Sequence, residues 1–276
     1  MLTVPKKTFF KSGPKPNKLL GQHFLRDKNV LAKIIEAANL TKNDSVLEVG
    51  PGLGVLTREL AKNAGQVIAI EKDKTLAEIL TRQLADEQID NVKIVPDDIL
   101  KINFSSLFDS LDYKVVANIP YYLTSHLIRL LLENATPPSE IVLLIQKEVA
   151  KRICAKPPDM SLLAVSVQFY AEAKIVASVS RKSFQPEPKV DSAIIEITPN
   201  QKYLDIDASK FFTLIHAGFS HPRKQLLGNL SKELKIAKEK IEISLTTAGI
   251  KNSQRAETLT VENWIELSKS LNLEAF

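Results

Sequence analysis

The stretch Ser45-Val46-Leu47-Glu48-Val49-Gly50-Pro51-Gly52-Leu53-Gly54 decides the fold. A short apolar run, rich in β-branched residues, passes directly into three glycines within five residues, which is typical of a buried strand followed by a tight turn. Glycine has no side chain, so such a turn lets the backbone approach a ligand closely. A plain strand-to-helix turn has the same composition, and the motif alone leaves that alternative open.

From this stretch onward, short apolar runs alternate with longer amphipathic ones, which predicts strands alternating with helices. This alternation indicates an α/β fold with a doubly wound, Rossmann-like parallel sheet, whose ligands lie beyond the carboxyl ends of the strands. The expected strands are 45–49, 66–70, 92–95, 113–117 and 140–145, with further extended segments at 174–179 and 193–198 and helices at 74–84 and 124–132.

After Pro199 the short apolar runs are replaced by amphipathic, glycine-poor segments, which predicts a smaller helical module. Its expected helices are 211–217, 224–234, 239–247 and 261–271. We therefore divide the chain into a flexible basic arm (1–18), a large α/β domain (19–199) and a small helical domain (200–276).

The charge of the chain favours a polyanionic partner. The net charge is +5 over 276 residues, and residues 1–28 hold seven basic side chains against one acidic side chain. Such an arm could lie along phosphates, although a solvated tail without a partner remains open. Cys154 is the only cysteine, which excludes an intrachain disulfide and favours a reducing compartment. With no apolar run long enough for export or for membrane insertion, we expect a soluble, cytoplasmic protein without a membrane partner.

The glycine motif differs from the dinucleotide fingerprint. That fingerprint needs glycine at its first, third and sixth positions, and here the sixth residue is Val55. Glu71 ends the next expected strand, where a carboxylate can accept hydrogen bonds from both ribose hydroxyls, although a solvated strand end fits Glu71 equally well. Asp97 and Asp98 follow the third strand and could accept from an adenine amino group, while one of them is expected to cap a helix. These positions favour a nucleoside cofactor.

The motif Asn118-Ile119-Pro120-Tyr121 follows the fourth expected strand and suits methylation of an exocyclic amine. Such an amine is a poor nucleophile because its lone pair is delocalised into the purine ring. The Asn118 oxygen and the Ile119 carbonyl can accept its hydrogens and direct the lone pair at a methyl donor. Tyr121 can stack on an extruded base. A β-turn without function has the same composition and stays open on this motif alone.

Taken together, five segments resemble the ribosomal RNA adenine dimethyltransferases that modify the small subunit, the kasugamycin-sensitivity methyltransferase family. The resemblance extends from about Lys18 to Leu230. It includes both motifs above and the segments Gly21-Gln22-His23-Phe24-Leu25, Gln146-Lys147-Glu148-Val149-Ala150 and Phe184-Gln185-Pro186-Glu187-Pro188-Lys189-Val190-Asp191-Ser192-Ala193.

The resemblance implies a class I methyltransferase that uses S-adenosylmethionine and releases S-adenosylhomocysteine. It also implies a monomer that dimethylates two adjacent adenines in a 3′-terminal hairpin loop of 16S RNA within an assembling small subunit. By the same resemblance, Phe184 closes the other face of the base opposite Tyr121, although ordinary core packing of Phe184 stays open. The implied cofactor residues are His23, Leu25, Gly50, Gly52, Glu71, Asp98 and Asn118, and the implied RNA contacts are Arg223 and Lys224.

The chain departs from the family pattern at His23, where asparagine is commoner, and at Asp97, where glycine is usual. Three alternatives remain: a 23S RNA adenine methyltransferase of the macrolide-resistance type, a ribosome-assembly binding factor without catalysis, and a nicotinamide dehydrogenase. Val55 and the lack of a candidate hydride-site histidine weigh against the last of these.

Overall fold

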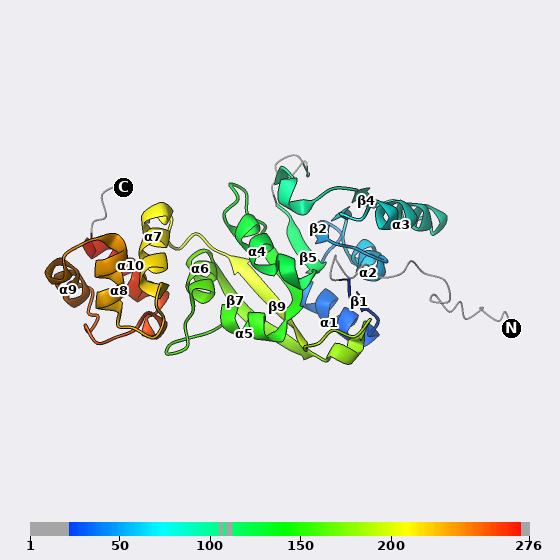
Figure 1. The fold of residues 1–276 in the computed structure, drawn as a ribbon. Helices are drawn as coiled ribbons and strands as arrows, with labels where there is room; N and C mark the ends of the chain where they lie inside the picture. The colour runs from blue at the N-terminus through cyan, green and yellow to red at the C-terminus, as the bar shows by residue number, and fades with distance from the viewer. Residues whose placement is uncertain (1–21, 105–106, 109–111, 272–276) are drawn as a thin grey trace.

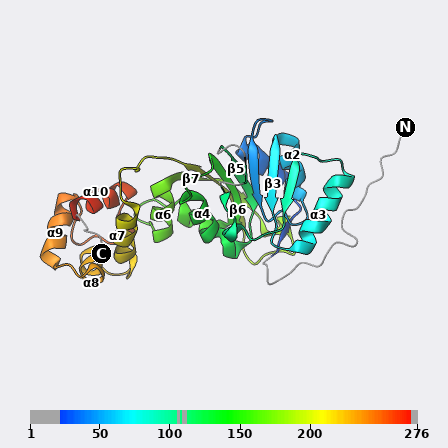
Figure 2. The ribbon, with the colours of Figure 1, turned by 90° about the horizontal axis from the view of Figure 1, so that it is seen from above.

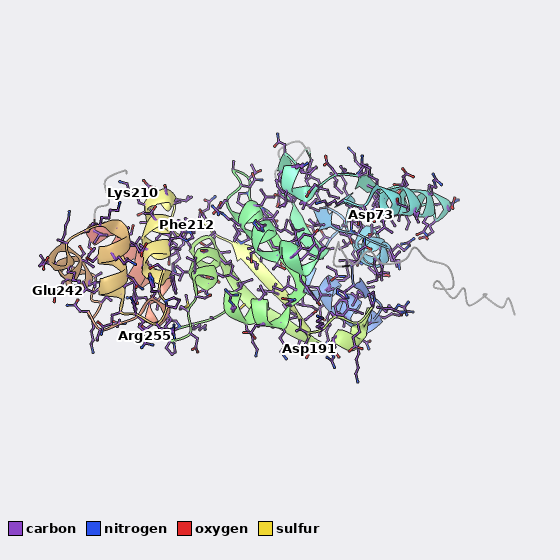
Figure 3. All side chains as sticks on the ribbon, in the orientation of Figure 1. Asp73, Asp191, Lys210, Phe212, Glu242 and Arg255 are labelled. Carbon is purple, nitrogen blue, oxygen red and sulfur yellow. The ribbon has the colours of Figure 1, made fainter. Side chains whose placement is uncertain are left out.

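The computed structural model describes residues 22–104, 107–108 and 112–271, so the predicted basic arm, 1–18, lies outside the described residues. Figure 1 shows a sheet covered by helices and, beside it, a separate group of helices, α7 to α10. Labelled side chains mark the two parts in Figure 3: Asp73 and Asp191 lie in the α/β part, and Lys210, Phe212, Glu242 and Arg255 lie in the helical part.

The sheet has seven strands in the order β4-β3-β2-β5-β6-β9-β7. The first five of these pair in parallel, while β9 runs antiparallel to both β6 and β7. The parallel part of the sheet therefore confirms the predicted α/β fold. The strands are β2 (Ser45–Val49), β3 (Gln66–Ile70), β4 (Val92–Val95), β5 (Lys114–Asn118), β6 (Glu140–Gln146), β7 (Ala171–Val179) and β9 (Ser192–Pro199).

Helices cover both faces of the sheet, as Figure 2 shows from above. The side chains of successive residues in a strand point to opposite faces, so Val46 packs with one set of helices, whereas Leu47 and Val49 pack with the other. The first set is α1 (Lys28–Ala38) and α2 (Val55–Asn63), and the second includes α4 (Thr124–Leu132) and α5 (Lys147–Ile153). Helix α3 (Lys74–Asp86) lies beside β4, the edge strand.

The helical part has its own apolar core, centred on the fully buried Trp264 and Phe211. Helix α6 (Leu162–Tyr170) contributes Ala164, Val165 and Phe169 to this core, which therefore reaches back across the predicted boundary at residue 199. The other helices of this part are α7 (Ala208–Phe219), α8 (Leu226–Leu234), α9 (Lys238–Thr247) and α10 (Val261–Leu271).

Most predicted elements are confirmed, and several of their ends need correction. The strands predicted at 45–49, 66–70 and 92–95 and the helices predicted at 124–132 and 261–271 have the predicted bounds. The strand predicted at 113–117 begins one residue later, and the helix predicted from 224 begins at Leu226 because Lys224 lies in the preceding turn, where its N–H donates to the His221 carbonyl (2.9 Å).

The short strands β1 (Phe24–Leu25) and β8 (Phe184–Gln185) were not expected. They pair antiparallel, with Leu25 opposite Phe184, and so join two segments that are distant in the sequence. Within the described residues, no helix is both long and apolar enough to span a membrane.

The packing of α7 against α10 leaves no room for a side chain at Gly218. A Cβ atom there would lie 2.3 Å from the Trp264 ring, whereas a Cβ at Gly228 in α8 would meet no atom within 4 Å. We expect Gly218→Ala to lower the free energy of unfolding by about 1–3 kcal/mol through overpacking.

The matched control, Gly228→Ala, adds the same methyl group to a helix without a clash. It should leave stability unchanged or raise it by about 0.5–1 kcal/mol, because alanine loses less conformational freedom in a helix. Urea denaturation of both variants measures the difference, and equal effects at the two glycines would contradict the packing described for α7 and α10.

Candidate active site

One pocket lies at the carboxyl edge of the parallel strands. Its walls come from residues 22–25, 48–53, 70–72, 97–100 and 118–123, together with Val55, Leu56 and Phe184. Loops that follow parallel strands meet at the same edge of a sheet, which explains why segments so far apart in the sequence share one wall. Among the predicted site residues, the pocket brings together His23, Leu25, Gly50, Gly52, Glu71, Asp98, Asn118, Tyr121 and Phe184.

The turn after β2 depends on glycine. Gly50, Gly52 and Gly54 all have positive φ angles, of 70°, 56° and 73°, a region that other residues rarely adopt. At Gly54 a Cβ would also lie 2.2 Å from Leu80 in α3. The guanidinium of Arg58 donates to the carbonyls of Leu53 and Gly54 (3.0 and 2.9 Å), which holds the turn against the start of α2.

Glu71 connects the end of β3 to this turn. Its carboxylate accepts the N–H of Gly52 (3.0 Å) and the N–H of Asp73 (2.9 Å), so both oxygens have defined directions. Burial raises the pKa of Glu71, and these two N–H groups oppose the rise. The carboxylate lines the pocket beside the glycine turn, the position predicted for a ribose ligand.

A second acid, Glu48, is buried deeper in the same wall, at 1% exposure. Its Oε2 atom is buried and has no hydrogen-bond partner. Burial, with a smaller contribution from the nearby Glu71 and against the opposing effects of Thr57 and Arg58, raises the pKa of Glu48 to about 8. The pocket therefore holds a carboxyl group that is neutral in part near pH 7.

Asp98 lines the same pocket as the glycine turn, and two contacts hold its carboxylate. It caps the short helix η2 (Ile99–Lys101) by accepting the Leu100 N–H (3.1 Å), as expected for one acid of this pair. Its other oxygen contacts the Lys72 ammonium at 2.9 Å. The hydrogen bond from Lys72 lowers the pKa of Asp98 and keeps it ionised as an acceptor.

Asn118 is the last residue of β5, and its amide Nδ2 donates to the His23 carbonyl at 3.3 Å. This contact turns the amide so that its oxygen is the atom able to accept from a ligand. The His23 ring forms a hydrogen bond through Nδ1 to the Pro186 carbonyl (2.7 Å). His23, which departs from the family pattern, therefore joins the Asn118 amide to the 184–193 segment.

Tyr121 begins the short helix η4 (Tyr121–Leu123) at the mouth of the pocket. The ring stacked on it is that of His23, with centroids 5.9 Å apart and planes 25° apart. Phe184, the residue predicted to face Tyr121, lines the pocket but is only 5% exposed and also packs in the core with Leu25. Phe184 therefore lies in the pocket wall and in the core, and its contact with a target base stays a prediction.

Arg223 and Lys224 lie elsewhere, in the helical part. With Lys238 and Arg255 they line a separate hollow beside the start of α8. Four basic side chains around one hollow suit contact with phosphate groups. The predicted site residues therefore lie in two places, the pocket at the sheet edge and this hollow on the helical part.

Several residues of the site were not singled out from the sequence. Arg58 and Lys72 occupy positions where the sequence pattern predicts solvent-exposed side chains. The structure shows that Arg58 holds the glycine turn and that Lys72 holds Asp98. Ser192 belongs to the 184–193 segment, and its hydroxyl lies 2.8 Å from that of Tyr121. The sequence signal that could have identified Ser192 is its position as a polar residue at the start of an apolar strand.

Comparison with known proteins agrees with this geometry. The sequence model described as "Ribosomal RNA adenine dimethylase" matches residues 13–273. The chain is 46% identical over 256 residues to a protein of Dehalococcoides mccartyi named ribosomal RNA small subunit methyltransferase A, covering 92% of this chain and 87% of the relative.

Two solved structures are similar along most of the chain. A dimethyladenosine transferase from Plasmodium falciparum has a TM-score of 0.75 and 28% identity, covering 89% of this chain and 96% of that one. The 23S rRNA methyltransferase ErmE has a TM-score of 0.73 and 30% identity, covering 91% of this chain and 100% of that one.

The sheet order, the glycine turn and the acids at the carboxyl edge define a class I methyltransferase fold. Within that class, the chain belongs to the ribosomal RNA adenine dimethylase family.

The buried Glu48 makes stability depend on pH. Its pKa is about 8 in the folded protein against 4.5 in the unfolded chain, so the folded state binds more protons between these values and loses stability as pH rises. Glu48→Gln removes this penalty. We expect the melting temperature of the variant to exceed that of the wild type by a margin that grows from pH 5 to pH 8 and then levels off.

The exposed Glu78→Gln is a suitable control, because the Glu78 side chain is 71% exposed and its melting difference should stay flat with pH. Thermal melts of the cofactor-free proteins across this range provide the measurement. A Glu48→Gln margin that does not change with pH would mean that Glu48 is ionised throughout.

Proposed function

We propose that this protein transfers methyl groups from S-adenosylmethionine to the N6 atoms of two adjacent adenines in a 3′-terminal hairpin loop of small-subunit ribosomal RNA. The observation that carries the proposal is the shared pocket, which both the Asn118–Tyr121 turn and the glycine turn after β2 line. The relatives named small subunit methyltransferase A, at 40–46% identity, favour the small-subunit substrate.

The pocket residues fit the proposed cofactor. Gly50 and Gly52 line the pocket with backbone at positive φ angles, so the turn can lie close to a ligand, and the Glu71 carboxylate beside them suits ribose hydroxyls. Asp98 suits the adenine amino group, since Lys72 keeps it ionised. The unpartnered oxygen of Glu48 is a buried acceptor in the same wall. When bound, the cofactor supplies a methyl group activated by a sulfonium.

The target amine would be held by acceptors at the end of β5. Asn118 presents its side-chain oxygen, because its nitrogen is engaged with His23. Together with the Ile119 carbonyl, this oxygen would accept both N–H groups and concentrate the lone pair on nitrogen. Tyr121 would stack on the extruded base, an interaction worth about 1–3 kcal/mol, and Phe184 would close the opposite side. No strong base is needed, because the proton leaves after nitrogen has become cationic.

RNA is proposed to contact both parts of the molecule. The basic hollow around Arg223 and Lys224 would take phosphates away from the pocket, and the arm 1–18 adds charge. Binding in two places suits a substrate that presents its loop within a folded particle, the assembling small subunit. We propose that the protein acts as a monomer in the cytoplasm.

Two other functions can be tested beside this one. The similarity to ErmE, a 23S rRNA methyltransferase, makes large-subunit RNA the second candidate substrate. A binding factor without catalysis is the other, and the intact set of Glu71, Asp98, Asn118 and Tyr121 in one pocket disfavours it.

The direct experiment incubates the protein and labelled S-adenosylmethionine with small ribosomal subunits that lack the modification. We expect dimethyladenosine at adjacent loop adenines, mapped by nuclease digestion and mass spectrometry. Asn118→Ala should lower the rate at least about 100-fold, because it removes one of the two acceptors for the amine.

Asn91→Ala is the matched control. Its side-chain amide also donates to backbone carbonyls, but at the amino-terminal end of the strands, so turnover should persist. Transfer to large-subunit RNA alone would overturn the proposed substrate, and transfer to neither RNA would favour the binding factor.

The basic hollow predicts that binding depends on salt. Arg223→Ala/Lys224→Ala should weaken binding to small subunits and reduce the slope of log affinity against log salt by about 2, one for each phosphate that is no longer neutralised. Arg82→Ala/Lys93→Ala removes the same charge near β4, at the far edge of the sheet, and should change the slope little. Equal slopes for the two double variants would place the RNA-binding surface outside the hollow.

A further inference from the structure

The hydroxyl of Tyr121 is tied to a buried serine. Tyr121 Oη and Ser192 Oγ lie 2.8 Å apart, although the two residues are 71 positions apart in the sequence. Ser192 is fully buried, at 0% exposure, whereas Tyr121 lines the open pocket. The contact therefore joins a ring at the site to the interior of the sheet.

The sheet fixes the position of Ser192. It is the first residue of β9 and is paired on both sides, with Gln146 of β6 and Val179 of β7. A hydroxyl in such a place has little freedom to move, since the backbone is held by two neighbouring strands. Residues supported in this way can position a group more accurately than residues on a loop.

Tyr121 itself is restrained at three points. Its hydroxyl meets Ser192, its backbone carbonyl accepts the Thr124 hydroxyl (3.1 Å), and its ring stacks on His23. The backbone contact fixes the start of the side chain, the His23 ring limits one face, and the hydroxyl contact holds the far end. Without the hydroxyl contact, only the His23 ring would oppose rotation about the side-chain bonds, and the stacking face would be less well defined.

We propose that Ser192 is a positioning residue for methyl transfer: it holds the phenol of Tyr121 so that the ring plane is set before the target adenine enters. This inference rests on the proposed stacking role of Tyr121. A base can stack on a ring in any orientation, but transfer needs the amine to meet the donor methyl at a defined angle and distance. Burial raises the pKa of the Tyr121 phenol, so it stays neutral and can share a hydrogen bond with Ser192 at physiological pH.

The test is a double-mutant cycle on the full-length protein with Ser192→Ala, Tyr121→Phe and the combined variant. Each single variant removes one partner of the hydrogen bond and keeps the ring. We expect each to lower kcat on small subunits about tenfold while KM changes less than about twofold, because docking uses other contacts. Since both variants break the same hydrogen bond, the combined variant should lose no more activity than either one.

Binding of S-adenosylhomocysteine, measured by calorimetry, separates positioning from loss of fold. It should stay within about twofold of the wild type in all three variants. Tyr113→Phe is the matched control, because it removes another buried phenol, bonded to the Thr136 carbonyl (3.2 Å), just before the opposite end of β5. Its kcat should remain that of the wild type.

Losses in kcat that multiply in the combined variant, or a Ser192→Ala variant with wild-type kcat, would overturn the proposal. Tyr121→Ala distinguishes this failure from a failure of the proposed function. If Tyr121→Ala is inactive while Ser192→Ala is fully active, stacking stands and the positioning role falls. If Tyr121→Ala is fully active, the assigned role of Tyr121 is wrong, and the Ser192 proposal falls with it.

Discussion

The parallel pairing of β2 with β3 and β5 is the constraint on which the site depends. Because these strands run in one direction, the glycine turn, Glu71 and Asn118 all emerge at the same edge. The pairing places Val49 opposite Ile70, and the N–H of Gly50 continues it by donating to the Ile70 carbonyl (2.9 Å). A shift by one residue would turn the buried side chains to the opposite face and move each functional group out of the pocket.

The acidic side chains in the pocket wall would be costly to bury without partners. Glu71 is stabilised by two backbone N–H groups, and Asp98 by Lys72. Glu48 differs because one of its oxygens has no partner, and burial raises its pKa. Buried polar groups without partners lower stability, so a ligand that formed a hydrogen bond with this oxygen would offset that cost. The unpartnered oxygen of Glu48 therefore suits a pocket wall that a ligand contacts when it binds.

The sequence was sufficient for the α/β fold and for the motifs that meet at the pocket. Short apolar runs and amphipathic segments predicted the parallel strands and most helices, and motifs at strand ends predicted their shared edge. The strands β1 and β8 were not predicted, because two-residue strands are too short to show a periodicity. The contact of Lys72 with Asp98 and that of Ser192 with Tyr121 were missed for another reason: each joins elements far apart in the chain, and no local pattern determines which distant groups meet.

The segment 184–193 shows how one stretch can serve both packing and chemistry. Phe184 pairs with Leu25 through β1 and β8, the Pro186 carbonyl meets the His23 ring, and Ser192 meets Tyr121. These contacts connect both the segment 22–25 and the turn after β5 to the segment 184–193. Ser192, at one end of this segment, is the first residue of β9, which lies between β6 and β7. If the target base binds as proposed, the sheet would therefore set the position of Tyr121, on which the base would stack, through Ser192.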